Sequence, residues 1–146
     1  MELTQKYGID PAYLHLEITE SAYAESPGQI IDTVKKLREQ GFIIEMDDFG
    51  SGYSSLNMFN QMEMDYLKLD MVFIQNELEK PAEHSILNYI IGMAHGMGLS
   101  VVAEGVETQE HMDRLRELKC DYVQGYYIAR PMPAEEFEIF LDTEVT

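Results

Sequence analysis

The sequence has no tryptophan, a single cysteine and no long hydrophobic run. One cysteine excludes an internal disulfide framework, and Cys120, placed between Leu118 and Tyr122, is expected to be a small buried thiol. The longest apolar stretches, such as residues 99–103, are far shorter than a bilayer span, and the N-terminus lacks the pattern of a signal peptide. We therefore expect a cytoplasmic chain without a membrane span.

Basic residues are also scarce: the chain has ten Lys and Arg and 27 Asp and Glu, which gives a formal net charge of −17. So acidic a surface repels DNA, RNA and anionic membranes, which excludes polymeric nucleic acid as an expected partner. A small phosphorylated ligand is still compatible with this charge if divalent cations bridge it to carboxylates. The length of 146 residues and the 45% hydrophobic content indicate one globular domain.

Short apolar runs alternate along the chain with amphipathic segments. The runs predict strands over residues 14–18, 42–46, 66–70, 99–103 and 122–126. Apolar residues at helical spacing predict helices over residues 30–37, 86–97, 112–118 and 137–141, with Thr108 as an N-cap, and residues 77–83 are predicted to be a polar connector. Regular alternation of strand and helix predicts a parallel α/β sheet.

The polar residues at the strand ends distinguish a barrel from an open, doubly wound sheet. A barrel collects its chemistry at the C-terminal ends of many strands, whereas a doubly wound sheet concentrates it at one switch point. Each predicted strand here ends in polar residues, namely Glu17 and Glu20, Asp47 and Asp48, Lys68 and Asp70, Glu104 and Glu107, and Gln124. The pattern favours an incomplete TIM-type (β/α) barrel of about five parallel strands, each followed by a helix, with roughly three of the usual eight strands absent.

Asp47 and Asp48 are adjacent carboxylates that lead into a loop with two glycines, residues 49–55. Like charges at this separation favour the presence of a divalent cation, which allows both carboxylates to stay ionised. A turn that uses Asp and Gly for structure alone is the other interpretation. Glu45 has the parity of Asp47 along its strand and is expected to play at most a supporting role.

Lys68 and Asp70 lie two residues apart and share a strand face that Leu67 and Leu69 do not share. A lysine directed into a barrel needs facing carboxylates or a water molecule, and the alternative is a surface ion pair. Glu104 follows an apolar run and suits a metal or water ligand. Glu107, which lies closer to the next helix, also fits a simple interaction with the helix dipole.

Together these segments resemble the EAL-domain family of cyclic-di-GMP phosphodiesterases. The matching stretches, in the family's order, are residues 16–21, 47–56, 65–70, 101–108, 124–126 and 130–133. The resemblance implies a TIM-type barrel that uses two Mg²⁺ or Mn²⁺ ions to hydrolyse one phosphodiester bond of cyclic-di-GMP, giving linear pGpG. The Glu-Ala-Leu signature and the following strand with its asparagine ligand are not in the sequence, so residues 1–146 are expected to be the C-terminal portion of one EAL domain.

The resemblance also implies a role for each candidate site residue. Asp47 would contact both ions, Glu17 would hold one, and Asp48 and Glu104 would hold the other. Lys68 would hold and orient the nucleophilic water. In the remaining roles Glu20 would brace the loop 48–55, and the site would be lined by Asp70, Glu107 and Gln124.

An incomplete barrel has unpaired strands at both edges and an exposed apolar face. We therefore expect a homodimer, strand exchange or a missing N-terminal segment, together with impaired hydrolysis by the chain alone. Three functions remain open on this evidence: a phosphodiesterase fragment that is active when completed, a cyclic-di-GMP-binding remnant without catalysis, and an inert scaffold.

Two other enzyme classes can be set aside. Asp48, Phe49 and Gly50 match the metal-binding tripeptide of protein kinases, but the other kinase motifs are missing. A glycoside hydrolase is disfavoured because the chain has no tryptophan for sugar stacking, and because adjacent aspartates with a strand lysine suit metal and phosphate better. The histidines show no shared metal-ligand spacing and are expected to be ordinary core or surface residues, namely His15, His84, His95 and His111.

Overall fold

The computed structural model describes residues 2–50 and 56–144. Its strands form one parallel sheet, and they are β1 (His15–Thr19), β2 (Ile43–Phe49), β3 (Tyr66–Leu69), β4 (Ser100–Ala103) and β5 (Tyr122–Val123). The α-helices are α1 (Glu2–Tyr7), α2 (Glu20–Glu25), α3 (Pro27–Glu39), α4 (Leu56–Gln61), α5 (Met71–Leu78), α6 (Leu87–Gly96), α7 (Gln109–Glu117) and α8 (Ala134–Glu144). Two short 3₁₀ turns, Pro11–Tyr13 and Ala82–His84, complete the described elements.

The order of the strands in space is their order in the sequence, β1-β2-β3-β4-β5. A doubly wound sheet would reverse direction at a switch point, whereas a (β/α) barrel adds each strand next to the preceding one. Within the described residues, β1 and β5 each pair on one side only, so the sheet is open. The prediction of an incomplete TIM-type barrel with five parallel strands is confirmed.

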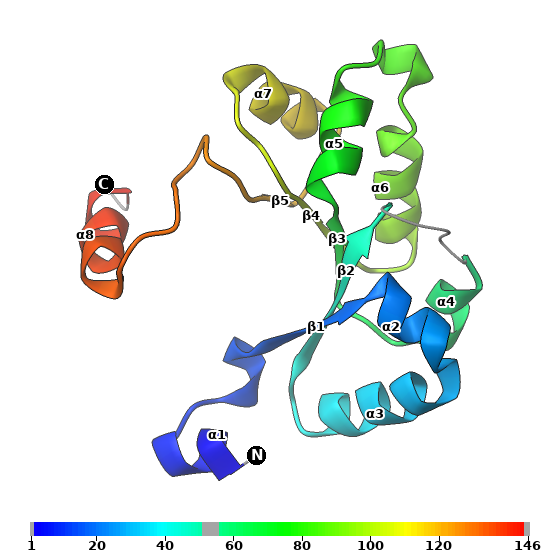
Figure 1. Cartoon of the computed structure of the whole chain (residues 1–146), viewed down its shortest axis with the longest axis vertical. Helices are drawn as coiled ribbons and strands as arrows, with labels where there is room; N and C mark the ends of the chain where they lie inside the picture. The colour runs from blue at the N-terminus through cyan, green and yellow to red at the C-terminus, as the bar shows by residue number, and fades with distance from the viewer. Residues whose placement is uncertain (1, 51–55, 145–146) are drawn as a thin grey trace.

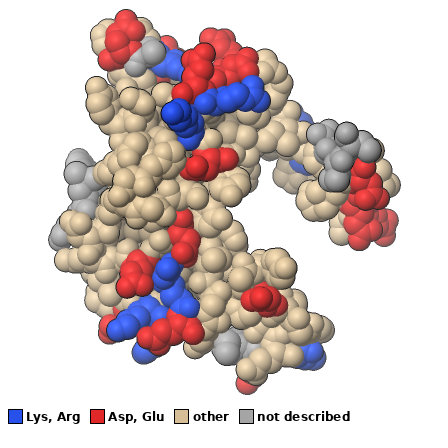
Figure 2. All heavy atoms as spheres, turned by 180° about the vertical axis from the view of Figure 1, so that it is seen from behind, with Lys and Arg blue, Asp and Glu red and all other residues tan. Residues whose placement is uncertain are grey.

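The helices lie mainly on one side of this sheet. Figure 1 shows α3, α4 and α6 along one side, whereas α1 and α8 stand clear of it on the other. No described helix is long and apolar enough to cross a membrane. On the face drawn in Figure 2, the basic side chains are set among acidic ones and form no separate basic surface.

Successive side chains along each strand point alternately to the helical side and to the concave side of the sheet, as the period of two requires. Side chains on the helical side are completely buried, and in the three central strands they are Ile44, Met46, Leu67, Leu69, Val101 and Ala103. They pack in one core with helical residues such as Val34, Ile74, Ile91 and Leu115. The intervening positions carry polar groups that face the concave side, including Glu45, Asp47 and Lys68.

Two similar carboxylate contacts hold the N-terminal ends of the strands in place. Asp65, just before β3, accepts a hydrogen bond from the backbone N–H of Ile44 at 2.9 Å and forms an ion pair with Arg38 at the end of α3. Asp121, just before β5, accepts from the N–H of Val101 at 2.8 Å and contacts His95 at 2.8 Å. In each case one carboxylate links a strand to the helix that precedes that strand in the chain.

The ends of several predicted elements differ from the structure. The strands predicted over 14–18, 66–70 and 99–103 match β1, β3 and β4 to within one residue at each end. The strand predicted over 42–46 continues three residues further, to Phe49, and β5 ends at Val123. Just beyond β5 the N–H of Val106 donates to the carbonyl of Gln124 at 3.1 Å, and the Val106 backbone passes so close to Gly125 that a Cβ would lie 2.1 Å from it, which favours glycine at this position. Thr108 is the N-cap of α7, as predicted.

The prediction of a polar connector over residues 77–83 was wrong at its start, because Glu77 belongs to α5 and is 3% exposed. Its carboxylate forms an ion pair with Lys80, and it accepts hydrogen bonds from the Ser85 hydroxyl at 3.2 Å and the Ile86 N–H at 2.8 Å. Burial alone would raise the pKa of Glu77, but these partners, with Lys80 first, lower it below its ordinary value. This carboxylate therefore ties α5 to the start of α6.

Cys120, just before β5, is partly buried and packs against the hydrophobic core, close to the expectation of a small buried thiol. Its Sγ donates weakly to the carbonyl of Val101 at 3.5 Å. Burial raises the pKa of the Cys120 thiol to about 11. The thiol therefore stays protonated and unreactive at neutral pH.

Glu77→Gln should lower the free energy of unfolding by roughly 1–3 kcal/mol, because Lys80 loses its partner and the buried hydrogen bonds weaken. Because the pKa of Glu77 is lower in the folded state than the ordinary value of 4.5, its contribution is complete above that value and is lost as the pH falls below it. Urea unfolding across acidic and neutral pH measures the difference. The exposed neighbour Glu79→Gln is the control, and equal effects of the two variants would contradict this role of Glu77.

Candidate active site

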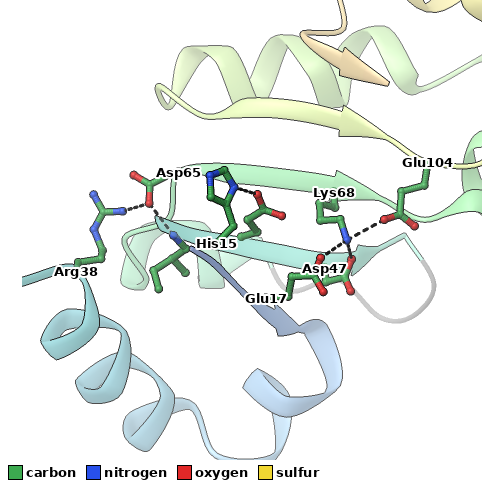
Figure 3. Close-up of polar contacts among 9 residues, drawn as sticks. His15, Glu17, Arg38, Asp47, Asp65, Lys68 and Glu104 are labelled. Carbon is green, nitrogen blue, oxygen red and sulfur yellow. Dashed lines mark hydrogen bonds and ion pairs between the residues drawn. The ribbon is translucent and has the colours of Figure 1, made fainter. Parts of the chain in front are cut away.

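Three carboxylates from different strands meet at the ammonium group of Lys68 in β3. The Nζ atom lies 2.5 Å from Glu17 Oε1, 2.8 Å from Asp47 Oδ1 and 2.8 Å from Glu104 Oε1. Figure 3 shows these side chains converging at the C-terminal end of the sheet, with Glu17 in β1, Asp47 in β2 and Glu104 just after β4. We call these four residues the Lys68 cluster.

The strand register explains why the cluster forms. Lys68 alternates with the fully buried Leu67 and Leu69 and so faces the concave side. The β2–β3 register is irregular between Met46 and Phe49. At this point Asp48 has a φ of 58°, which is unusual for a residue other than glycine and sharply turns the end of the strand. Asp47 therefore reaches the cluster, whereas the Asp48 side chain is exposed.

The electrostatic balance of the Lys68 cluster depends on burial. The Lys68 side chain is 9% exposed, and those of Asp47 and Glu104 are 17% and 22% exposed. Burial alone would lower the pKa of Lys68, but the contacts with Asp47, Glu104 and Glu17 outweigh it and raise the pKa well above its ordinary value. Lys68 is therefore an ammonium ion, and the cluster carries one positive and three negative charges.

The other predicted site residues lie around the cluster without joining it. Glu20 is the first residue of α2; it is buried, and its two carboxylate oxygen atoms have no hydrogen-bond partner among the described residues. The loop that it was expected to brace includes residues 51–55, which lie outside the described residues. Asp70 is the N-cap of α5 and accepts from the N–H of Phe73 at 3.0 Å. The side chains of Glu107 and Gln124 are exposed.

The chemistry of the Lys68 cluster fits a divalent metal ion of the hard, oxygen-binding type. Glu17, Asp47 and Glu104 bring carboxylate oxygen atoms to within hydrogen-bond distance of one point, and Mg²⁺ and Mn²⁺ prefer such ligands. The shared point is the Lys68 ammonium. In residues 2–50 and 56–144, no group of three His, Cys, Asp or Glu side chains, those of the Lys68 cluster included, is arranged to hold a metal ion while Lys68 occupies the shared point.

A second polar layer lies below the cluster on the same face. The sequence predicted a supporting role for Glu45 there, but His15 was expected to be an ordinary residue and Tyr66 was not singled out. The Nδ1 atom of His15 contacts Glu45 Oε1, and the His15 ring centroid is 5.1 Å from that of Tyr66. Each of these residues precedes a cluster residue by two positions, on β1, β2 and β3, so strand parity contained the signal. Burial, followed by the nearby Tyr122, raises the pKa of Tyr66. The layer places polar and aromatic groups where a complete barrel has its interior.

Comparison with known proteins agrees with this arrangement. The EAL domain family model matches residues 1–131. The cyclic di-GMP phosphodiesterase NbdA of Pseudomonas aeruginosa is 41% identical over 137 residues, which are 94% of this chain and 18% of NbdA. The PaMucR phosphodiesterase of the same species, solved as a c-di-GMP complex, superimposes with a TM-score of 0.86 at 33% identity and covers 93% of this chain and 55% of PaMucR.

A third comparison concerns the metal. The manganese and cyclic di-GMP complex of BlrP1 from Klebsiella pneumoniae superimposes with a TM-score of 0.82 at 28% identity, over 89% of this chain and 33% of BlrP1. Structures of EAL homologues thus hold divalent metal ions, which supports metal dependence in the family.

The strand order and the Lys68 cluster define a domain of the β/α-barrel class with its functional groups at the C-terminal strand ends. With the family match over residues 1–131, the chain belongs to the EAL domain family. It spans 18% to 34% of the length of the first curated relatives that it matches.

Lys68→Met should lower the free energy of unfolding by roughly 3 kcal/mol, because three carboxylates then face one another without a cation in a largely buried place. Urea unfolding at neutral pH measures the loss, with Lys35→Met on the exposed surface of α3 as the control. Adding Glu104→Gln to Lys68→Met should recover part of the loss, which a double-mutant cycle quantifies. Equal stability of the two lysine variants would show that the cluster does not hold the strand ends together.

Proposed function

We propose that this chain forms part of the active face of a phosphodiesterase that hydrolyses cyclic di-GMP to linear pGpG with divalent metal ions. The meeting of Glu17, Asp47 and Glu104 at Lys68 carries the proposal. Two relatives support the proposal, since NbdA is a cyclic di-GMP phosphodiesterase and PaMucR was solved as a complex with c-di-GMP. We also propose that residues 1–146 are the C-terminal portion of one EAL domain.

In this proposal the metal ions are Mg²⁺ or Mn²⁺, and their ligands are Glu17, Asp47, Asp48 and Glu104. Bound ions would polarise the phosphoryl oxygens and favour ionisation of the attacking water. The three carboxylates of the Lys68 cluster supply negative charge in excess of the lysine, which supports cation binding.

Once bound metal ions take over the carboxylates that now contact Lys68, its N–H donors would be free to hold and orient the water molecule. The water oxygen would form a bond to phosphorus, the bond from phosphorus to the ribose 3′ oxygen would break, and that oxygen would take up a proton from solvent to become a hydroxyl group. One carboxylate of the cluster accepts the proton that the water loses. The product is opened at one phosphodiester and keeps the phosphate on its 5′ side.

The remaining site residues have positioning roles in the proposal. Glu20 would support the loop 48–55, and its two buried oxygen atoms, without partners among the described residues, are free to do so. Asp70, Glu107 and Gln124 would line the substrate side of the sheet. Asp70 already fixes the start of α5 immediately after the strand that carries Lys68.

We propose further that additional strands complete the barrel, supplied by a second copy, by strand exchange or by a longer chain. Both edges of the sheet carry exposed apolar residues, namely Leu14 just before β1 and Tyr122 in β5. Glu17 lies on the edge strand β1 with 51% of its side chain exposed. That exposure favours an alternative in which the chain alone binds cyclic di-GMP but hydrolyses it poorly.

The test is to incubate the purified chain with cyclic di-GMP and Mn²⁺ and to detect pGpG by chromatography. Asp47→Asn should reduce the rate roughly 100-fold or more, because even outer partners of metal ligands affect metal sites by about 10–100-fold. Asp113→Asn, an exposed carboxylate on α7, makes the same chemical change and should retain the activity.

The rate is measured over a range of chain concentrations. A specific activity that rises with concentration supports completion of the barrel by a second copy. Absence of pGpG at every concentration, together with binding of cyclic di-GMP in equilibrium dialysis, would contradict hydrolysis and support the binding alternative. Equal loss in the two Asn variants would contradict the role of Asp47.

A further inference from the structure

Two neighbouring hollows lie in the outer helical layer, between the segment that follows α5 and helix α7. Their cavity volumes are about 280 and 380 Å³, and Lys80, Pro81 and Arg114 line both of them. No member of the Lys68 cluster is among the described residues that line them. The hollows are therefore separate from the candidate active site.

Arg114 is held in place by the end of α5. Its Nη1 atom donates a hydrogen bond to the backbone carbonyl of Leu78, the last residue of α5. Arginine side chains commonly satisfy helix carbonyls in this way. Its Nη2 atom is buried and has no hydrogen-bond partner in the described part of the chain. One end of the guanidinium is thus anchored, and the other carries unused N–H donors.

His111 lies three residues before Arg114 on α7, which places both on one face of the helix. It lines the larger hollow together with Arg114, and its Nδ1 atom is also buried without a partner among the described residues. Buried polar atoms are nearly always hydrogen bonded in folded proteins. Two residues that line one hollow thus each have a nitrogen atom without a partner among the described residues, which points to a ligand with oxygen acceptors.

The charges around the hollows restrict the kind of ligand. Lys80 and Arg114 are two of only ten basic residues in a chain with a net charge of −17. In Figure 2, basic and acidic side chains crowd together at the end of the molecule where α5 and α7 lie, the top of the view. The acidic residues among the lining disfavour a polyanion, and they are Glu79, Glu110 and Glu117. A guanidinium matches the oxygen atoms of a single phosphate group well.

We propose that the hollow between α5 and α7 binds one phosphate group, held by Arg114 and His111 with Lys80 at the rim. The site goes beyond the proposed phosphodiesterase reaction, since it shares no residue with the Lys68 cluster. A free phosphate ion and a nucleoside monophosphate both offer this group, and the contacts with Arg114 are the same for either source.

The test is an NMR titration of the ¹⁵N-labelled chain with sodium phosphate, at constant ionic strength and without divalent ions. We expect saturable shifts of the His111 and Arg114 amide signals. Arg114→Met should weaken binding about tenfold or more, the loss expected for a hydrogen bond to a charged group. Arg116→Met removes the same charge from an exposed position of the same helix and should leave binding unchanged.

His111→Leu keeps the contact between Arg114 and Leu78, so it tests the site even if Arg114→Met does not fold. A parallel titration with guanosine 5′-monophosphate identifies the source. Affinity equal to that of phosphate supports the free ion, and tighter binding that still depends on Arg114 supports a nucleotide. The proposal is overturned if neither probe gives saturable shifts, if Arg116→Met loses as much affinity as the Arg114 variant, or if His111→Leu binds as the unchanged chain does. None of these results depends on hydrolysis of cyclic di-GMP.

Discussion

The ammonium group of Lys68 allows the C-terminal ends of neighbouring strands to bring their carboxylates together. A buried lysine is tolerated only beside opposite charges, and three carboxylates can approach one another only around a cation. Glu17, Asp47 and Glu104 come from β1, β2 and the end of β4, so one group in β3 connects four neighbouring strands. The same balance that stabilises the C-terminal edge of the sheet concentrates negative charge there, which is the condition for binding a divalent ion.

The two ends of the sheet carry out different tasks. The N-terminal ends are fastened by Asp65 with Arg38 and by Asp121 with His95, contacts that join strands to helices. The C-terminal ends carry the candidate active site. Barrel proteins separate stability and function between their two ends in this way. The sheet is open at β1 and β5 within the described residues. At the β1 edge Glu17 is half exposed, where a further strand would shield it.

The sequence predicted the strands and the convergence at Lys68 because both follow from short-range rules. Alternation placed Lys68 opposite Leu67 and Leu69, and parallel strands bring their ends to one edge. Features that depend on tertiary contacts were missed. Helix α5 is too short for a clear period, and Glu77 looks like a surface residue until its partners Lys80 and Ser85 fold over it. The positive φ that separates Asp48 from Asp47, and the contact of Val106 with Gln124 just beyond β5, arise only in the folded chain.

We propose that the three carboxylates around Lys68 are where this chain binds a divalent ion. Paramagnetic broadening of amide signals by substoichiometric Mn²⁺ tests it most directly, because the effect falls steeply with distance from the ion. The account predicts that the signals of Glu17, Asp47, Lys68 and Glu104 broaden first. Broadening that begins instead at the acidic helix α8, around Glu135 and Glu136, would contradict the account and leave the Lys68 cluster with a structural role alone.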